Sequence, residues 1–302
     1  MGTTARAWQR FRQHRFGLAG LVVLVLLVVA CLSAGWLAAV LGIDPNAVDL
    51  FGQYGAPSGS HPLGQDDLGR DVLLRLLAGG QVSLSVALVA AVAAASIGTV
   101  VGLAAGYMGG WLDAMLMRLV DSVIALPLLP LLIVLAAIDP TKLGFGAWAE
   151  EQSFGLIRIV LIVAAVGWTT PARLVRGATL AAREQGYVLA ARALGVAPAV
   201  VAIRHILPNV SGPLIVATTL AMGQVILFES ALSFLGLGIQ PPTPSWGNML
   251  TGAQELIWQA PMLAVYPGLA IFLTVVSVNF LGDALQDALA PRSSERADRG
   301  ST

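Results

Sequence analysis

The stretch VSLSVALVAAVAAASIGTVVGLAA, residues 82–105, contains no charged side chain and no proline. A helix needs about 20 apolar residues to cross the hydrocarbon core of a membrane, and in lipid only helices and closed barrels satisfy every backbone polar group. The stretch therefore predicts a membrane-spanning helix. The rest of the chain is similar, because its mean hydropathy is +0.80 and only 11% of its residues are charged. Such a composition excludes a soluble globular domain.

Further apolar runs on both sides of this stretch bring the predicted spans to six. They cover residues 17–41, 82–105, 119–138, 156–171, 213–235 and 262–281. We expect an all-α, polytopic membrane protein with six transmembrane helices.

The positions of lysine and arginine predict how the chain is oriented, because these residues gather on the cytoplasmic side of a membrane. If the N-terminus is inside, 13 of the 17 basic residues fall in inner segments. These segments are 1–16, 106–118, 172–212 and 282–302. Both termini and the segment 172–212 are therefore expected in the cytoplasm, and the polar tail 286–302 should follow the last span there.

The outer segments suggest local structure next to the spans. Helical spacing over residues 68–76 predicts a short interfacial helix, which Gly79 and Gly80 would end before the second span. In the loop 233–250, Trp246 is expected at the boundary between membrane and water. At the inner end of the third span, Arg118 and Asp121 are one helical turn apart and are expected to pair.

The inner stretch YVLAARALGVAPAVVAIRHILPNV, residues 187–210, predicts two short helices joined by a corner. Gly195 stands where a helix ends in the left-handed conformation, and Pro198 can start the second helix. Pro208 is expected to bend the chain into the fifth span. One face of the first helix is expected to consist of Tyr187, Ala190, Ala191 and Leu194, at positions i, i+3, i+4 and i+7.

Two interpretations of this unit remain open. Its arginines can meet lipid phosphates, as in an amphipathic interfacial loop. Alternatively, the flat alanine surface and the rigid glycine and proline positions can form a docking element for another protein.

The unit resembles the cytoplasmic loop of bacterial ABC importer permeases, which has a glutamate-alanine-alanine start, a glycine and a later leucine-proline pair. Ala190-Ala191, Gly195 and Leu207-Pro208 match these positions, and Leu189 replaces the glutamate. The stretches HPLGQDDLGRDVLLRLLAGGQVSLSV (61–86), RHILPN (204–209) and ALSFLGLGIQPPTPSWGNML (231–250) also resemble the dipeptide/oligopeptide/nickel subfamily, in particular its C-type subunit.

The resemblance implies a type I ABC importer permease fold in a bacterial inner membrane. It implies an N-terminal part (1–60), a permease domain (61–285) with a cytoplasmic coupling loop (173–212), and the tail (286–302). The implied partners are a sister permease, two ATPases and an extracytoplasmic substrate-binding protein. It also implies that Tyr187, Ala190, Ala191, Leu194, Gly195 and Pro208 couple the chain to an ATPase, and that di- or oligopeptides are the substrate.

The chain has no phosphate-binding loop of the form G-x-x-x-x-G-K-[ST], so ATP and Mg²⁺ are expected on the partner ATPases and no cofactor in this chain. The three histidines lie in separate segments, which argues against a metal site. No histidine falls within a predicted span to activate a serine, which argues against a membrane-embedded enzyme. Zero net charge gives no reason to expect nucleic-acid binding.

Two questions stay open. Glu229 lies in the fifth span, where an ionisable residue can line the pathway or contact the sister subunit; alternatively, it is hydrated near the interface and only makes hydrogen bonds between helices. The same architecture can also import nickel or another small solute instead of peptides.

Overall fold

The computed structural model describes residues 3–139, 152–252, 255 and 258–289. The outer residue Lys142 and most of the expected tail 286–302 lie outside the described residues.

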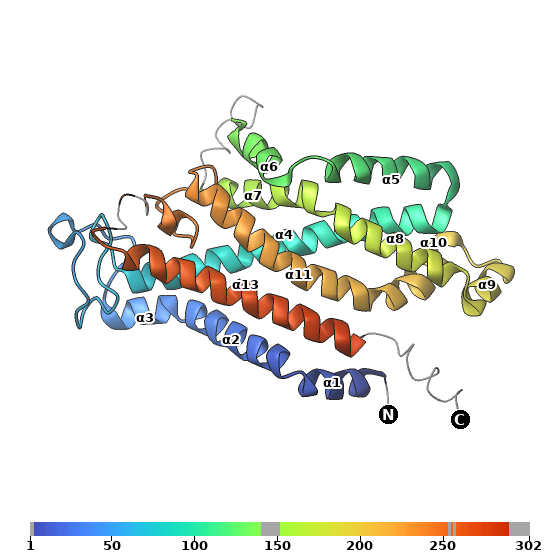
Figure 1. Cartoon of the computed structure of the whole chain (residues 1–302), viewed down its shortest axis with the longest axis horizontal. Helices are drawn as coiled ribbons and strands as arrows, with labels where there is room; N and C mark the ends of the chain where they lie inside the picture. Colours follow the sequence, from blue (N-terminus) through green and yellow to red (C-terminus); the bar gives the residue numbers. More distant parts are fainter. Residues whose placement is uncertain (1–2, 140–151, 253–254, 256–257, 290–302) are drawn as a thin grey trace.

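The described part of the chain is an elongated bundle of helices (Figure 1). The α-helices are α1 (Thr3–Gln13), α2 (Arg15–Leu32), α3 (Ala34–Leu41), α4 (Val72–Met108), α5 (Gly110–Ile124), α6 (Leu128–Ala137), α7 (Gln152–Gly167), α8 (Thr169–Arg183), α9 (Gly186–Ala193), α10 (Pro198–Val200), α11 (Leu207–Phe234) and α13 (Met262–Leu289). A π-helical segment, η4 (Val201–Ile206), joins α10 to α11, and the loops contain the 3-10 turns η1 (Leu50–Gly52) and η5 (Asn248–Leu250).

The six expected spans correspond to four single helices and two bent helix pairs. Among the described residues, four helices are long and apolar enough to cross a membrane by themselves, and two bent helix pairs bring the number to six. The pair α5 and α6 is bent by 86° and the pair α7 and α8 by 43°. The third and fourth spans are therefore not straight. In the first pair the bend coincides with Pro127, which caps α6 and cannot donate a helical hydrogen bond.

The start of α4 corrects one expectation. No separate interfacial helix precedes it among the described residues, because α4 begins at Val72 and continues through Gly79 and Gly80 to Met108. The two glycines allow the loop at Ser245 and Trp246 to pack closely against α4. A Cβ on Gly80 would lie 2.7 Å from Cζ2 of Trp246, and a Cβ on Gly79 would lie 3.2 Å from the backbone of Ser245.

Helices α4 and α8 pack with their backbones close together. Gly98, Gly102 and Gly106 lie one turn apart along α4, and each leaves no room for a Cβ against α8. On Gly102, for example, a Cβ would lie 2.5 Å from the carbonyl oxygen of Ala172. Small residues at this spacing allow membrane helices to approach each other without an apolar driving force.

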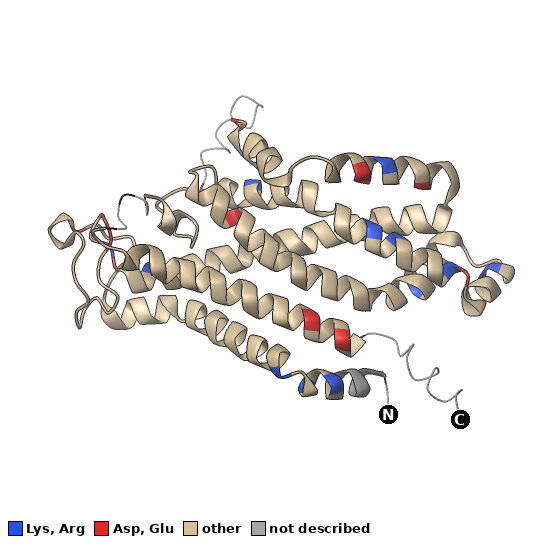
Figure 2. Cartoon of the chain, in the orientation of Figure 1, with Lys and Arg blue, Asp and Glu red and all other residues tan. Residues whose placement is uncertain are grey.

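The two ends of the bundle differ. Both termini of the described chain and α9 lie at one end, and the loops between α3 and α4 and between α11 and α13 lie at the other (Figure 1). Among the described residues, the arginines are concentrated in the half that contains α9 and α1 (Figure 2). The chain therefore brings its expected inner segments to the same end of the molecule.

Candidate functional site

Helix α9 ends at a well-formed glycine cap. Gly195 has a φ of 76°, its amide donates to the carbonyl of Arg192 at 3.0 Å, and the amide of Val196 donates to the carbonyl of Ala191 at 3.1 Å. These two bonds make a Schellman motif, which satisfies carbonyls that the helix end leaves free. A Cβ on Gly195 would meet nothing within 4 Å, so glycine is required only by the backbone conformation.

The two sides of α9 have different surroundings. Val188 is fully buried and Ala191 is only 7% exposed. Tyr187, Ala190 and Leu194 are exposed, and Leu194 reaches 84%. Ala191 packs into the chain's own core, in contrast to the other three residues of the expected contact face, and a role of these residues in coupling stays a prediction.

The buried side of α9 rests on a compact apolar cluster formed by α8, α9, η4 and α11. Its buried members are Val175, Ala182, Val188, Ala191, Val201, Ile206 and Val210. Polar and aromatic contacts hold the helix from two further directions: the Nδ2 of Asn209 donates to the hydroxyl of Tyr187 at 2.9 Å, and the guanidinium of Arg192 lies 5.8 Å from the ring centroid of Tyr107 on α4. Helix α9 therefore contacts α4, α8 and α11 directly.

After the corner that follows α9, the chain continues from α10 into α11 without a break. Pro198 is the first residue of α10, as expected, and residues Pro198–Phe234 form one continuous helix. The segment η4 widens this helix to a π-helical turn directly before Pro208. Proline cannot donate to the carbonyl four residues earlier and its ring crowds that carbonyl, so a local π-helical turn relieves the conflict.

Three arginines of the segment 172–212 form ion pairs within the chain. Arg176 makes a two-pronged ion pair with Asp113 of α5, with Nη2 2.6 Å from Oδ2. Arg173 pairs with Asp121, so the expected pair between Arg118 and Asp121 is wrong. Arg183 pairs with Glu184 at 3.0 Å. The pairs of Arg176 and Arg173 join α8 to α5, although the residues are far apart in the sequence, whereas Arg183 and Glu184 are consecutive.

Glu229 is fully buried within the chain. The Ser83 hydroxyl donates to its Oε2 at 3.0 Å, and the Ser233 hydroxyl donates to its Oε1 at 2.8 Å. Each serine accepts in turn from the loop that follows α11, Ser83 from the amide of Trp246 at 3.2 Å and Ser233 from the amide of Ile239 at 3.0 Å. The carboxylate therefore organises the outer loop; a role of Glu229 in the pathway or in a contact with another subunit stays a prediction.

Trp246 corrects the expectation made for this loop. Its side chain is 1% exposed rather than placed at a membrane surface. The indole Nε1 donates to the carbonyl of Leu76 on α4 at 2.9 Å. Trp246 thus fastens the loop onto α4.

A cavity of about 480 Å³ lies where the two helix bends meet α4 and α11. All of the described residues that line it are uncharged, and its polar groups belong to Thr169, Thr170, Gln224 and Gln286. The sequence did not point to this cavity, because it depends on where the bent pairs α5–α6 and α7–α8 fall.

Comparisons with known proteins agree over most of the chain. Residues 98–295 match the family described as binding-protein-dependent transport system inner membrane component. Residues 3–57 match the N-terminal transmembrane domain of oligopeptide transport permease C.

Individual relatives are similar over nearly their full length. A putative peptide permease protein of Brucella ovis is 39% identical over 295 residues, which is 97% of this chain and 92% of the relative. A glutathione transport system permease protein of Shigella flexneri serotype 5b is 40% identical over 285 residues, which is 94% of this chain and 89% of the relative.

Proposed function

This chain belongs to the inner membrane components of binding-protein-dependent transport systems, and from this premise we propose that it forms half of the pathway of an importer for di- or oligopeptides. As a permease of this family it is a non-enzymatic transmembrane subunit, and ATP binding occurs on partner ATPases. The proposed assembly contains a sister permease, two ATPases and an extracytoplasmic substrate-binding protein.

The observation that carries the proposal is the arrangement of α9. Its exposed side chains Tyr187, Ala190 and Leu194 form the proposed contact with an ATPase, while its buried side rests on α8, η4 and α11. Gly195 fixes the corner. Closure of two ATPases around ATP would then move the helices that enclose the cavity, as a rigid-body switch between two states.

Peptides are favoured as substrates by two observations. The relatives that cover nearly all of this chain carry names of peptide and glutathione permeases. The cavity is lined by uncharged groups and offers none of the nitrogen, sulfur or carboxylate ligands that a nickel ion prefers. A pathway with such walls suits a zwitterionic peptide better than a bare metal cation.

The test is reconstitution of the assembly into lipid vesicles with its ATPases, sister permease and binding protein. We expect ATP hydrolysis and uptake to rise with the binding protein and peptides, and not with Ni²⁺. Stimulation by nickel alone would replace the proposed substrate, while the assignment to the permease family would remain.

A cross-linking experiment tests the contact and the orientation together. In a background where Cys31 is replaced by serine, Leu194→Cys should cross-link to an ATPase subunit, whereas the matched variant Val188→Cys, which is buried, should not. Labelling of Leu194→Cys by a membrane-impermeant thiol reagent added outside intact cells would contradict the cytoplasmic position of α9.

A further inference from the structure

Gln224 brings an unpaired carboxamide to the wall of the cavity, half-way along the expected fifth span 213–235. Its side chain is exposed, and within the described part of the chain its carboxamide forms no hydrogen bond. The hydroxyls of Thr218 and Thr219 on the same helix instead donate to the helix's own carbonyls, at 2.8 and 2.9 Å. Because an amide that leaves water without a partner costs free energy, Gln224 is expected to have a partner that this chain does not supply.

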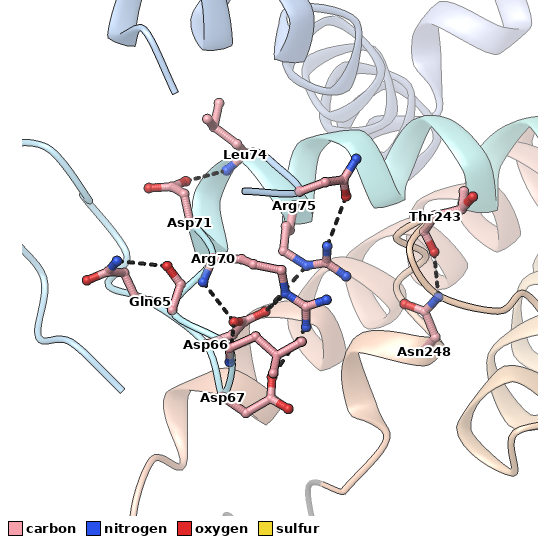
Figure 3. Close-up of polar contacts among 12 residues, drawn as sticks. Gln65, Asp66, Asp67, Arg70, Asp71, Leu74, Arg75, Thr243 and Asn248 are labelled. Atoms are coloured by element: carbon pink, nitrogen blue, oxygen red, sulfur yellow. Dashed lines mark hydrogen bonds and ion pairs between the residues drawn. The ribbon is translucent and has the colours of Figure 1, made fainter. Parts of the chain in front are cut away.

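Several other carboxamides of the chain are paired. The Nδ2 of Asn248 donates to the carbonyl of Thr243 at 2.8 Å, and the Nε2 of Gln65 donates to a backbone carbonyl in its own loop at 2.8 Å (Figure 3). The Nε2 of Gln81 on α4 donates to the carbonyl of Cys31 on α2 at 2.6 Å. These groups fix loops or helices in place, whereas the carboxamide of Gln224 is left for a ligand or a second chain.

The shape of the surroundings favours a ligand over a second chain. The cavity volume of about 480 Å³ falls within the range of about 300–1,000 Å³ that is typical of sites for small molecules. Such sites have mainly apolar walls and a few polar groups that orient the ligand. The described walls of this cavity have that composition, with apolar side chains such as Leu132, Val163 and Phe228. A carboxamide that only joined two subunits would need no concave site around it.

The polar groups of the wall are complementary to a peptide bond. The hydroxyl of Thr169 donates to the carbonyl of Val166 at 3.2 Å, which leaves its oxygen as an acceptor only. Thr170 is exposed at the wall and forms no hydrogen bond with the described residues, so its hydroxyl can donate. Gln224 offers one acceptor oxygen and two amide donors. The cavity thus provides acceptors for an N–H and donors for a C=O, and none of its described walls carries a charge.

We propose that the cavity is a transit site for short peptides, in which the Oε1 of Gln224 accepts from a peptide N–H and the hydroxyl of Thr170 donates to a peptide carbonyl. The proposal rests on the proposed function and adds the residues that contact the substrate. Because every peptide has these backbone groups, the site accepts different side chains. A hydrogen bond between uncharged groups changes an affinity by about two- to tenfold, which is weak enough for the peptide to leave again.

The test is uptake into lipid vesicles that contain the complete assembly. The probes are dialanine and its ketomethylene analogue, in which a CH₂ group replaces the peptide N–H and both charged ends remain. Each probe is supplied as a saturated complex with the binding protein, so that the affinity of that protein does not set the rate. We expect the original assembly to transport dialanine about two- to tenfold faster than the analogue, because only dialanine can donate to Gln224.

Three variants separate the contacts. Gln224→Met keeps the length of the side chain and removes its hydrogen-bonding groups, so its kcat for dialanine should fall to near that for the analogue, while the KM for the loaded binding protein should not change. Thr170→Val should lower kcat for both probes, because both keep the carbonyl that the hydroxyl contacts. The matched control is Asn279→Leu. Asn279 on α13 is also an exposed carboxamide but does not line the cavity, so the ratio of the two rates should stay that of the original chain.

Several results would overturn the proposal. An unchanged ratio of the two rates in Gln224→Met would remove this residue from the site. Loss of the sister permease from the purified Gln224→Met assembly would assign the carboxamide to a contact between subunits. If the original assembly takes up both probes at the same rate, the site fails while the proposed function stands. If it takes up Ni²⁺ and neither probe, the proposed function fails and the transit site fails with it.

Discussion

The two loops at opposite ends of the α10–α11 helix are held in different ways. The outer loop after α11 is tied by a buried carboxylate, two serines and an indole N–H, all within this chain. The inner unit around α9 is held mainly by apolar packing and a glycine cap, with one hydrogen bond from Asn209 and one contact of Arg192 with a ring at its edges, and its other face is exposed. Buried polar networks specify one arrangement because every unpaired member is costly, whereas an exposed apolar face is free to accept another protein. We therefore expect variants of the outer loop to lower stability, and variants of α9 to lower coupling.

The largest effect on stability is expected for Glu229→Ala. The change leaves the hydroxyls of Ser83 and Ser233 without their shared acceptor in a buried site, which should lower the free energy of unfolding by about 3 kcal/mol. Thermal unfolding of the purified assembly measures the effect. The matched control is Glu255→Ala, which removes an exposed carboxylate of the same outer region. Equal melting temperatures for the two variants would show that the outer loop is not held by this network.

The next effect is expected for Gly195→Val, because a β-branched residue is strained at a φ of 76°. The strain is about 1–2 kcal/mol and falls on the corner of the proposed contact. The variant should remain in the membrane, but transport should be uncoupled from ATP hydrolysis. Gly195→Asn, which tolerates this conformation, and Gly186→Val, whose side chain meets nothing within 4 Å, serve as controls. Normal peptide uptake by Gly195→Val would count against the role of the corner.

A smaller loss of stability is expected for Trp246→Phe. The ring can still pack against Gly80, but the hydrogen bond from Nε1 to Leu76 is lost, which should lower stability by about 1 kcal/mol. Thermal unfolding should show no change for Trp258→Phe, because Trp258 is 90% exposed. If the two tryptophan variants behaved alike, the indole bond would have no measurable part in holding the loop.

The smallest change in stability is expected for Leu194→Ser, within about 0.5 kcal/mol, because this side chain is exposed in the isolated chain. Its effect should be on association instead, with less ATPase retained when the permease is purified. Leu194→Met keeps the apolar surface and should retain the ATPase. A large drop in melting temperature for Leu194→Ser, measured on the permease alone, would mean that α9 is held by this residue and is not open for docking.

The spans, the helix α9 and its left-handed glycine could be predicted because each depends on residues close together in the sequence. The apolar runs are long enough to satisfy the membrane, and Gly195 lies where a helix ends before a proline. The faces of α9 were only partly predicted. Ala190 and Ala191 are consecutive, and about 100° separates consecutive residues around a helix, so spacing cannot decide which of the two points to the core.

The sequence by itself determined that this chain is a helical membrane protein and that a basic helix–glycine–proline unit separates two of its spans. Tertiary structure decided that α4 continues through Gly79 and Gly80, which leave room for the loop at Ser245 and Trp246 to pack against the helix. It also decided that Trp246 is buried and that Asp121 pairs with Arg173. These features depend on which segments meet. In a chain this apolar almost any span is compatible with lipid, so contacts between distant segments, and not hydropathy, select the partner of each polar group.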